Sequence, residues 1–163
     1  MKYAMTLDGK IATVTGKSKW ITGEKARENV HMDRSRFMGI MVGVGTVIAD
    51  NPSLTSRGKD LKNPIRIICD TWLRTPLSSE VVASAKNYET IIATSNLDVE
   101  AQQPYIEKGC KIITVSRKKE KINLKELMMK LGNEGIDSII LEGGASLNAS
   151  ALEEGIVHKI QAY

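Results

Sequence analysis

Aromatic side chains are scarce in this sequence: one Phe, two Trp and four Tyr make up 4% of its 163 residues. Proteins that bind single-stranded nucleic acid without sequence preference stack the bases on aromatic rings. The scarcity therefore argues against a nucleic-acid partner. The core must be built mostly from aliphatic side chains, which a hydrophobic fraction of 42% can supply.

Cysteine is also rare, and the two cysteines, Cys69 and Cys110, stand alone and far apart. Neither belongs to a Cys-x-x-Cys pair, so the spacing of a structural zinc site is missing and we expect no bound metal. Cys69 lies in an apolar run, which predicts a small buried side chain.

Long apolar runs are missing too. No stretch approaches the roughly 18 residues that suggest a membrane span, and we find no apolar core of a signal peptide. We therefore expect a cytoplasmic protein with no membrane partner. The net charge is +4, and a site for phosphorylated ligands explains this mild excess as well as nucleic acid does. The length predicts a single domain over residues 1–163.

What the sequence does contain is a regular series of short apolar runs. They are centred on Ile40, Ile67, Ile91, Ile113 and Ile140. Each run is continuous and rich in β-branched residues, which is typical of parallel strands buried on both faces. The gaps between the runs have the length of βαβ crossovers. We predict a three-layer α/β fold with one mainly parallel sheet and helices on both faces.

The segments between the runs have helical patterns. We predict helices over residues 23–37, 81–86, 99–108 and 124–131, and a further helix that begins at residues 143–144. Thr22 is the predicted N-cap of the first helix, and Gly132 the predicted end of the fourth. Strands are expected at residues 3–7 and 159–163. Because the chain begins and stops within these strands, we expect the domain to be truncated at both ends.

Residues 43–57, which read GVGTVIADNPSLTSR, follow the first buried run directly. Gly43 and Gly45 would let the backbone approach a ligand closely. Thr46 would start a helical turn whose free N–H groups suit an anion, and Arg57 has a planar fork suited to phosphate. The alternative interpretation is a strand–turn–helix followed by a solvated loop.

A second pair of glycines, Gly143 and Gly144, follows Glu142 where a strand should end and a helix begin. Open parallel sheets bind ligands beyond the carboxyl ends of their strands, and a helix N-terminus can hold a pyrophosphate. A tight strand-to-helix turn is the alternative. The first glycine pair is not a Rossmann fingerprint, because Ile48 stands where the third glycine should be.

Four stretches resemble, in the same order, the motifs of the bacterial riboflavin-biosynthesis reductases, the reductase half of a bifunctional deaminase/reductase. Residues 5–10 are similar to its SLDGK, residues 18–22 to SxWIT/S, residues 43–57 to VGxGTVxxDxPxLxxR, and residues 141–150 to EGGxxLxxS. The resemblance implies a dihydrofolate-reductase-like fold and, through a sheet edge, a possible homodimer. It also implies that NADPH reduces the phosphorylated pyrimidine 5-amino-6-(5-phosphoribosylamino)uracil from its ribosyl to its ribityl form. The deaminase motifs HxE and PCxxC do not occur in the sequence, so we expect the deaminase domain to be absent.

The resemblance also assigns residues. It implies a cofactor site formed by Met5, Trp20, Thr46, Asp50, Thr71, Gly144, Ala145, Ser146, Leu147, Asn148, Ala149 and Ser150. It implies a substrate site formed by Lys10, Ser18, Arg34, Leu54, Arg57 and Glu142. Arg34 and Arg57 are the expected phosphate ligands, and Asp50 and Glu142 the candidates for moving a proton during catalysis.

Each of these assignments has a simpler alternative. Arg34 is also explained as a surface arginine at the edge of an apolar stripe, and Lys10 as an exposed lysine in a turn. Asp50 is also explained as a brace for the turn that follows it. His31 and His158 fall in no motif, and we expect both at the surface or on a helix face.

Two further questions stay open at this level. Asp70 ends a predicted strand, where a carboxylate usually binds a ribose 2′-hydroxyl, whereas the resemblance places Thr71 near a 2′-phosphate. The function also has alternatives: a reductase that acts before deamination, as in archaea and fungi, a dihydrofolate reductase, or a non-catalytic domain that binds phosphoribosyl ligands.

Overall fold

The computed structural model of the chain describes residues 1–16, 18, 21–58 and 61–163. Five of its strands form one sheet in the order β5-β4-β3-β2-β8, and all four neighbouring pairs are parallel. These strands are β2 (Gly39–Gly43), β3 (Ile65–Cys69), β4 (Thr90–Thr94), β5 (Lys111–Thr114) and β8 (Ile139–Leu141). They correspond to the five apolar runs, so the predicted parallel sheet is confirmed.

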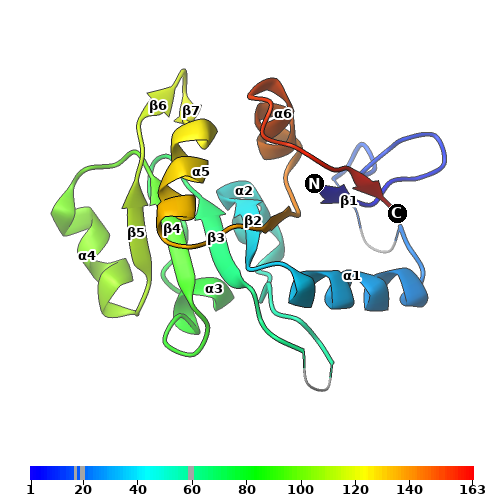
Figure 1. Ribbon diagram of the computed structural model, residues 1–163, viewed down its shortest axis with the longest axis horizontal. Coiled ribbons are helices and arrows are strands. Elements are labelled where there is room, and N and C mark those ends of the chain that lie inside the picture. Colours follow the sequence, from blue (N-terminus) through cyan, green and yellow to red (C-terminus); the bar gives the residue numbers. More distant parts are fainter. Residues whose placement is uncertain (17, 19–20, 59–60) are drawn as a thin grey trace.

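Helices cover both faces of this sheet, as predicted (Figure 1). They are α2 (Val44–Asp50), α3 (Glu80–Ala83), α4 (Val99–Glu107), α5 (Leu124–Asn133) and α6 (Ala145–Glu153). A further helix, α1 (Glu24–Arg36), lies beside the sheet, and its residues belong to neither core. Side chains of α5 and α6 pack into the core on one face, and those of α2, α3 and α4 into the core on the other. Along β2, Met41 belongs to the first core, and Ile40 and Val42 to the second. Because both faces are buried, the strand has no polar side and its sequence is continuously apolar.

Two smaller pairs of strands lie outside the central sheet. β1 (Lys2–Tyr3) pairs in parallel with β9 (Gln161–Ala162), and β6 (Arg117–Lys118) forms a hairpin with β7 (Lys121–Ile122). The strand predicted over residues 3–7 is therefore mostly wrong, because residues 7 and 8 already form a turn. Within the described ranges, no helix has both the length and the apolar character needed to cross a membrane.

Two predicted helix starts are corrected by the structure. α1 has Gly23 as its N-cap, one residue after the predicted Thr22, and the Thr22 carbonyl accepts a hydrogen bond from Arg27 Nη1 at 2.8 Å. The turn predicted to start at Thr46 is part of α2, which begins two residues earlier at Val44.

The predicted end of α5 also differs. Gly132 lies inside the helix, which continues to Asn133, and the chain turns away at Gly135 with φ of 81°. A positive φ costs little only for glycine, so Gly135 is the residue that ends this helix. α4 contains Pro104 without ending there.

One arginine is completely buried beneath the second helical layer. Arg66 on β3 has 0% exposure. Its guanidinium donates hydrogen bonds to Thr90 Oγ1, Ser84 Oγ and the carbonyls of Ser53, Val81 and Tyr88. A single side chain thus joins β3 to β4, to α3 and to the loop after α2, and it satisfies carbonyls that water cannot reach.

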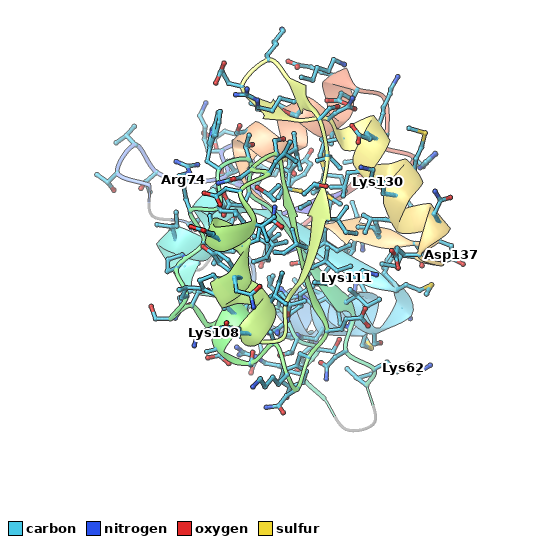
Figure 2. The ribbon with its side chains drawn as sticks, turned by 90° about the vertical axis from the view of Figure 1, so that its left-hand side faces the viewer. Lys62, Arg74, Lys108, Lys111, Lys130 and Asp137 are labelled. Carbon is cyan, nitrogen blue, oxygen red and sulfur yellow. The ribbon has the colours of Figure 1, made fainter. Side chains whose placement is uncertain are left out.

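Replacing Arg66 with methionine would leave these buried acceptors without a donor. We expect Arg66→Met to lower the free energy of unfolding by about 3 kcal/mol, measured by urea denaturation. Lys108→Met is the control, because Lys108 is exposed at the surface (Figure 2). This substitution should change the free energy of unfolding by less than about 0.5 kcal/mol. An Arg66→Met variant as stable as the wild type would contradict this role.

Candidate functional site

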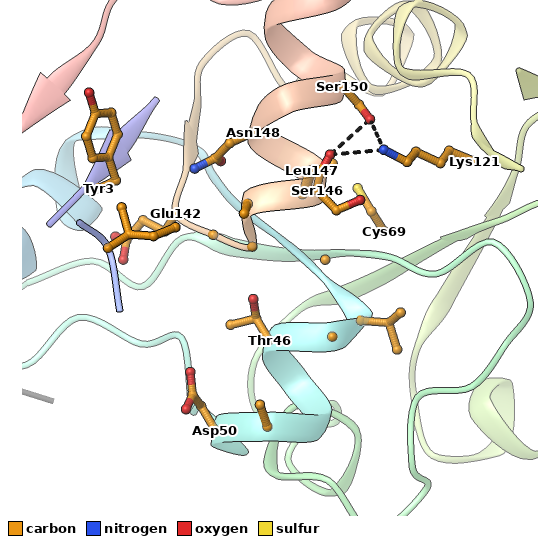
Figure 3. A pocket seen from close by; sticks show the side chains of 18 of the residues that line it. Tyr3, Thr46, Asp50, Cys69, Lys121, Glu142, Ser146, Leu147, Asn148 and Ser150 are labelled. Atoms are coloured by element: carbon orange, nitrogen blue, oxygen red, sulfur yellow. Dashed lines mark hydrogen bonds between the residues drawn. The ribbon is translucent and has the colours of Figure 1, made fainter. Parts of the chain in front are cut away.

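The order of the strands creates a cleft. From β2 the chain adds β3, β4 and β5 in one direction, and it then returns to place β8 on the other side of β2. The helices that follow β2 and β8 pack on opposite faces, so the chain diverges beyond the carboxyl ends of these two strands. This is where open parallel sheets bind ligands. The cleft between α2 and α6 measures about 780 Å³ (Figure 3).

The base of the cleft is formed where the first residues of α2 and α6 approach each other. A Cβ atom added to Gly143 would lie 3.3 Å from Thr46 Oγ1, and one added to Gly144 would lie 3.4 Å from the same atom. Gly144 also has φ of 79°, which side chains rarely adopt. The two glycines therefore keep space open beside Thr46, while a Cβ atom on Gly45 would meet nothing described within 4 Å.

Positive charge collects at the start of α6. The N-cap of this helix is Gly144, which makes no side-chain cap hydrogen bond, and its first turn contains no acidic residue. The Lys121 ammonium from β7 donates to Ser150 Oγ at 2.9 Å and to the Ser146 carbonyl at 3.4 Å (Figure 3). A cation here adds to the positive end of the helix dipole, so this part of the cleft attracts anions.

A buried ion pair closes the other end of the cleft. Arg34 of α1 donates from Nε to Glu142 Oε1 at 2.8 Å and from Nη2 to Oε2 at 2.9 Å, and the two side chains are 16% and 6% exposed. Arg34 Nη1 also donates to the Thr55 carbonyl at 3.0 Å. A guanidinium has five N–H groups, and three of them bond to described residues, which leaves two without a partner in the described part of the chain. Arg34 is thus a structural partner of Glu142 and not a solvated surface arginine.

Arg57 lies beyond this pair, with its side chain exposed. Its backbone N–H donates to Nδ1 of His31 on α1, with an N···N distance of 3.3 Å. Burial lowers the pKa of His31, and the neighbouring Arg34 and Arg57 lower it further. His31, which fell in no motif, therefore lies between the two predicted phosphate ligands.

Lys2 and Cys69 line the cleft as well, and burial shifts the pKa of both. Burial lowers the pKa of Lys2, although the Glu142 carboxylate acts in the opposite direction. Burial raises the pKa of Cys69 to about 12, so this thiol stays protonated and is a poor nucleophile. Among the described residues, no cluster of three or more His, Cys, Asp or Glu is arranged to hold a metal ion.

In the loop after β3, Thr71 lines the cleft and Asp70 does not. Asp70 is fully buried, and its Oδ2 accepts hydrogen bonds from the backbone N–H and the hydroxyl of Thr75, both at 2.7 Å. It therefore braces the turn and does not face the cleft. Thr71, Trp72 and Arg74 line the cleft instead. Arg117 of β6 stacks on the Trp72 ring, 4.7 Å from its centroid.

Most of the residues implied by the resemblance line this one cleft. They are Ser18, Thr46, Asp50, Thr71, Glu142, Gly144, Ala145, Ser146, Leu147, Asn148 and Ser150. Others lie outside its lining: Met5, Lys10, Arg34, Leu54, Arg57 and Ala149. Trp20 lies outside the described residues. Of the second group, Arg34 still reaches the cleft through its bond to Glu142, and Lys10 is exposed in a turn held by Thr6.

For two of the implied residues, the side chain is not available to a ligand. The side chains of Leu54 and Leu147 are buried in the two cores, so any ligand contact there belongs mainly to the backbone.

Asp50 ends α2 and is exposed to the cleft (Figure 3). The C-cap of α2 is Asn51, whose own backbone N–H bonds to the Val47 carbonyl, so Asp50 is not needed to end the helix.

The sequence motifs did not identify several cleft residues. Lys2, Tyr3, Trp72, Arg74 and Lys121 all line it. They belong to β1, to the loop after β3 and to β7, which lie far apart in the sequence and meet at the cleft. One signal was available for Arg74, a cation three residues after Thr71 at the end of a predicted strand.

The chain is similar over its whole length to proteins of known name. The chain is 50% identical to the riboflavin biosynthesis protein RibD of Actinobacillus pleuropneumoniae over 100% of its own length and 43% of that protein. It is 36% identical to a 2,5-diamino-6-ribosylamino-4(3H)-pyrimidinone 5′-phosphate reductase of Methanothermobacter thermautotrophicus, over 99% of this chain and 74% of that protein. The chain thus spans less than half of the first relative and about three quarters of the second.

The fold agrees with a crystal structure as well. A deaminase/5-amino-6-(5-phosphoribosylamino)uracil reductase from Thermotoga maritima superposes with a TM-score of 0.77 at 34% identity, over 93% of this chain and 40% of that one. The family model described as the RibD C-terminal domain matches residues 1–163. This chain therefore belongs to the RibD C-terminal domain family.

Proposed function

We propose that the chain uses NADPH to reduce the ribosyl group of 5-amino-6-(5-phosphoribosylamino)uracil to ribityl, a step of riboflavin biosynthesis. The main support for the proposal is that two features lie next to each other in one cleft. The glycine-rich start of α6 suits a dinucleotide, and the Glu142–Arg34 pair directly before it suits a polar sugar. Membership of the family supports the same activity.

The residues present fit a dinucleotide phosphate. The space beside Gly143 and Gly144, the positive start of α6 and the Lys121 ammonium favour a pyrophosphate there. Thr71 and Arg74 supply a hydroxyl and a guanidinium at the far end of the cleft, which suit the additional 2′-phosphate of NADPH. NADPH supplies the hydride, and the protein orients the reactants and excludes water.

The substrate occupies the end of the cleft near α1 in this proposal. Arg57, with the two free N–H groups of Arg34, binds its phosphate, and Glu142 accepts hydrogen bonds from its hydroxyl groups. Because Arg34 also fixes both oxygens of Glu142, the phosphate site and the sugar site are held at a constant separation.

The chemistry requires proton transfer as well as a hydride. Opening of the ribose ring breaks the bond between C1′ and the ring oxygen, places a proton on that oxygen and leaves an imine. The imine carbon then accepts the hydride and its nitrogen a proton. Asp50 and Lys2 line the cleft and move these protons in this proposal, and burial makes the Lys2 ammonium a better acid than an exposed lysine.

A second candidate substrate is the pyrimidine before deamination. The Methanothermobacter thermautotrophicus relative, of which this chain covers 74%, is a reductase of that compound. Reduced-nicotinamide absorbance measured with each purified pyrimidine separates the two. We expect turnover with the deaminated compound, and faster turnover with the other would reverse the assignment. Binding of both without turnover would indicate a binding domain.

The cofactor end of the cleft predicts a preference for NADPH over NADH. Arg74→Ala should lower kcat/KM for NADPH by about tenfold, the effect of one charged hydrogen bond, and leave that for NADH nearly unchanged. Lys108→Ala, which changes a distant exposed cation, is the control. Equal kcat/KM for the two cofactors in the wild type would contradict the assignment of Thr71 and Arg74.

The phosphate site predicts a defect in binding when Arg57 is removed. Arg57→Ala should raise KM for the phosphorylated substrate by one to two orders of magnitude, corresponding to about 1.5–3 kcal/mol for a charged hydrogen bond. Its kcat should change little, because the contact is the same in the ground and transition states. An unchanged KM would exclude Arg57 from the site.

Substitutions of the two carboxylates are expected to change different kinetic constants. Glu142→Gln should mainly raise KM, because Glu142 orients the substrate throughout the reaction. Asp50→Asn should lower kcat by about 10²–10⁴ with little change in KM if Asp50 moves the proton. A pH–rate profile of Asp50→Asn with wild-type shape and rate would remove Asp50 from the mechanism.

A further inference from the structure

His31 connects helix α1 to the loop that carries Arg57. It lies three residues before Arg34, so both side chains leave the same face of α1. His31 Nδ1 accepts the backbone N–H of Arg57, and Arg34 Nη1 donates to the carbonyl of Thr55 in the same loop. Two adjacent side chains of α1 therefore hold residues 55–57 by hydrogen bonds to their backbone.

The other side of this loop is held independently. The carbonyl of Ser53 accepts a hydrogen bond from the buried Arg66, at 3.2 Å. Residue 53 is thereby tied to the central sheet and residue 57 to α1. Among these contacts, only the one with His31 is made by the backbone of Arg57. It therefore holds the backbone position from which the Arg57 side chain extends.

The contact requires a neutral imidazole. Nδ1 can accept a hydrogen bond only when the ring proton is on Nε2. The charged groups that face His31 are Arg34 on its own helix, Arg57 in the loop and Glu142 after β8. Burial and the two arginines lower the pKa of His31, which favours the neutral form, although Glu142 and a hydrogen bond with the Thr55 backbone act in the opposite direction. The contact is therefore complete above this pKa and is lost as pH falls through it.

We propose that His31 is a positioning residue that keeps Arg57 at the substrate-phosphate site by accepting the Arg57 backbone N–H. The inference rests on the proposed function, because it assumes that Arg57 binds the phosphate of the substrate. It adds a residue that touches neither substrate nor cofactor. It also predicts that phosphate recognition weakens in acid for a reason that lies in the protein and not in the ligand.

Three variants test the contact. His31→Ala removes the acceptor, and it should raise KM for the phosphorylated substrate about five- to tenfold, the effect of one neutral hydrogen bond, with kcat within twofold. His31→Asn places an amide oxygen near the position of Nδ1 and should restore KM to within twofold of wild type. His158→Ala changes the other histidine of the chain and should have no effect. The nucleoside without its phosphate should bind all four proteins equally.

The pH dependence separates positioning from direct phosphate binding. The ratio of wild-type KM to His31→Asn KM cancels the titration of the substrate phosphate, and it should rise as pH falls through the pKa of His31. A ratio that falls instead would show that the imidazolium binds the phosphate, and it would overturn the proposal. An unchanged KM in His31→Ala would overturn it as well.

Hydrogen exchange gives a readout that does not need activity. The amide of Arg57 should exchange faster in His31→Ala than in the wild type, and at the wild-type rate in His31→Asn. Equal exchange in all three proteins would overturn the contact. A wild-type protein that protects this amide and reduces no substrate would refute the proposed function instead, which keeps the two failures distinct.

Discussion

The cleft depends on the ion pair between Arg34 and Glu142. It joins α1, which lies at the margin of the fold, to the residue that follows the edge strand β8. Both oxygens of Glu142 are engaged by a planar fork, so the carboxylate has a fixed orientation. Removing either partner would leave an unpaired charge in a mostly buried place, which costs far more than the intact pair contributes.

This pair also explains why charged groups can be packed so closely around one site. Arg34 is neutralised by Glu142, so its remaining N–H groups can serve another anion without accumulating net charge. The rest of the described lining includes the cations Lys2, Arg74 and Lys121 and the acidic residues Asp50 and Glu120, and Arg117 stacks on the lining residue Trp72. The cleft is therefore lined by charges of both signs.

The sequence was sufficient to predict the strands of the central sheet but not the order in which they lie in it. The run around Ile40 is apolar at every position, and only a strand buried on both faces needs this. Which strand neighbours which depends on packing between distant helices, so the place of β8 beside β2 had no local signal. Thr46, Glu142 and the start of α6, which belong to separate motifs, line one cleft.

Errors came where one residue type serves several purposes. Thr22 is a good N-cap residue in general, but its carbonyl is used by Arg27 and the helix begins after the adjacent glycine. The hairpin at residues 117–122 was missed because its charged residues resemble a solvated loop. His31 was set aside because no motif contains it, and only the folded chain brings the Arg57 backbone to its ring.

The pairing of β1 with β9 has a consequence for the order in which the site is completed. Lys2 and Tyr3 line the cleft, yet their strand is held by residues 161 and 162, almost the full chain length away. A contact between such distant segments closes a very large loop, which makes it slow to form. With only two residues in each strand, it is also among the cheapest parts of the fold to open. We therefore expect this wall of the cleft to close late in folding and to open before the central sheet does.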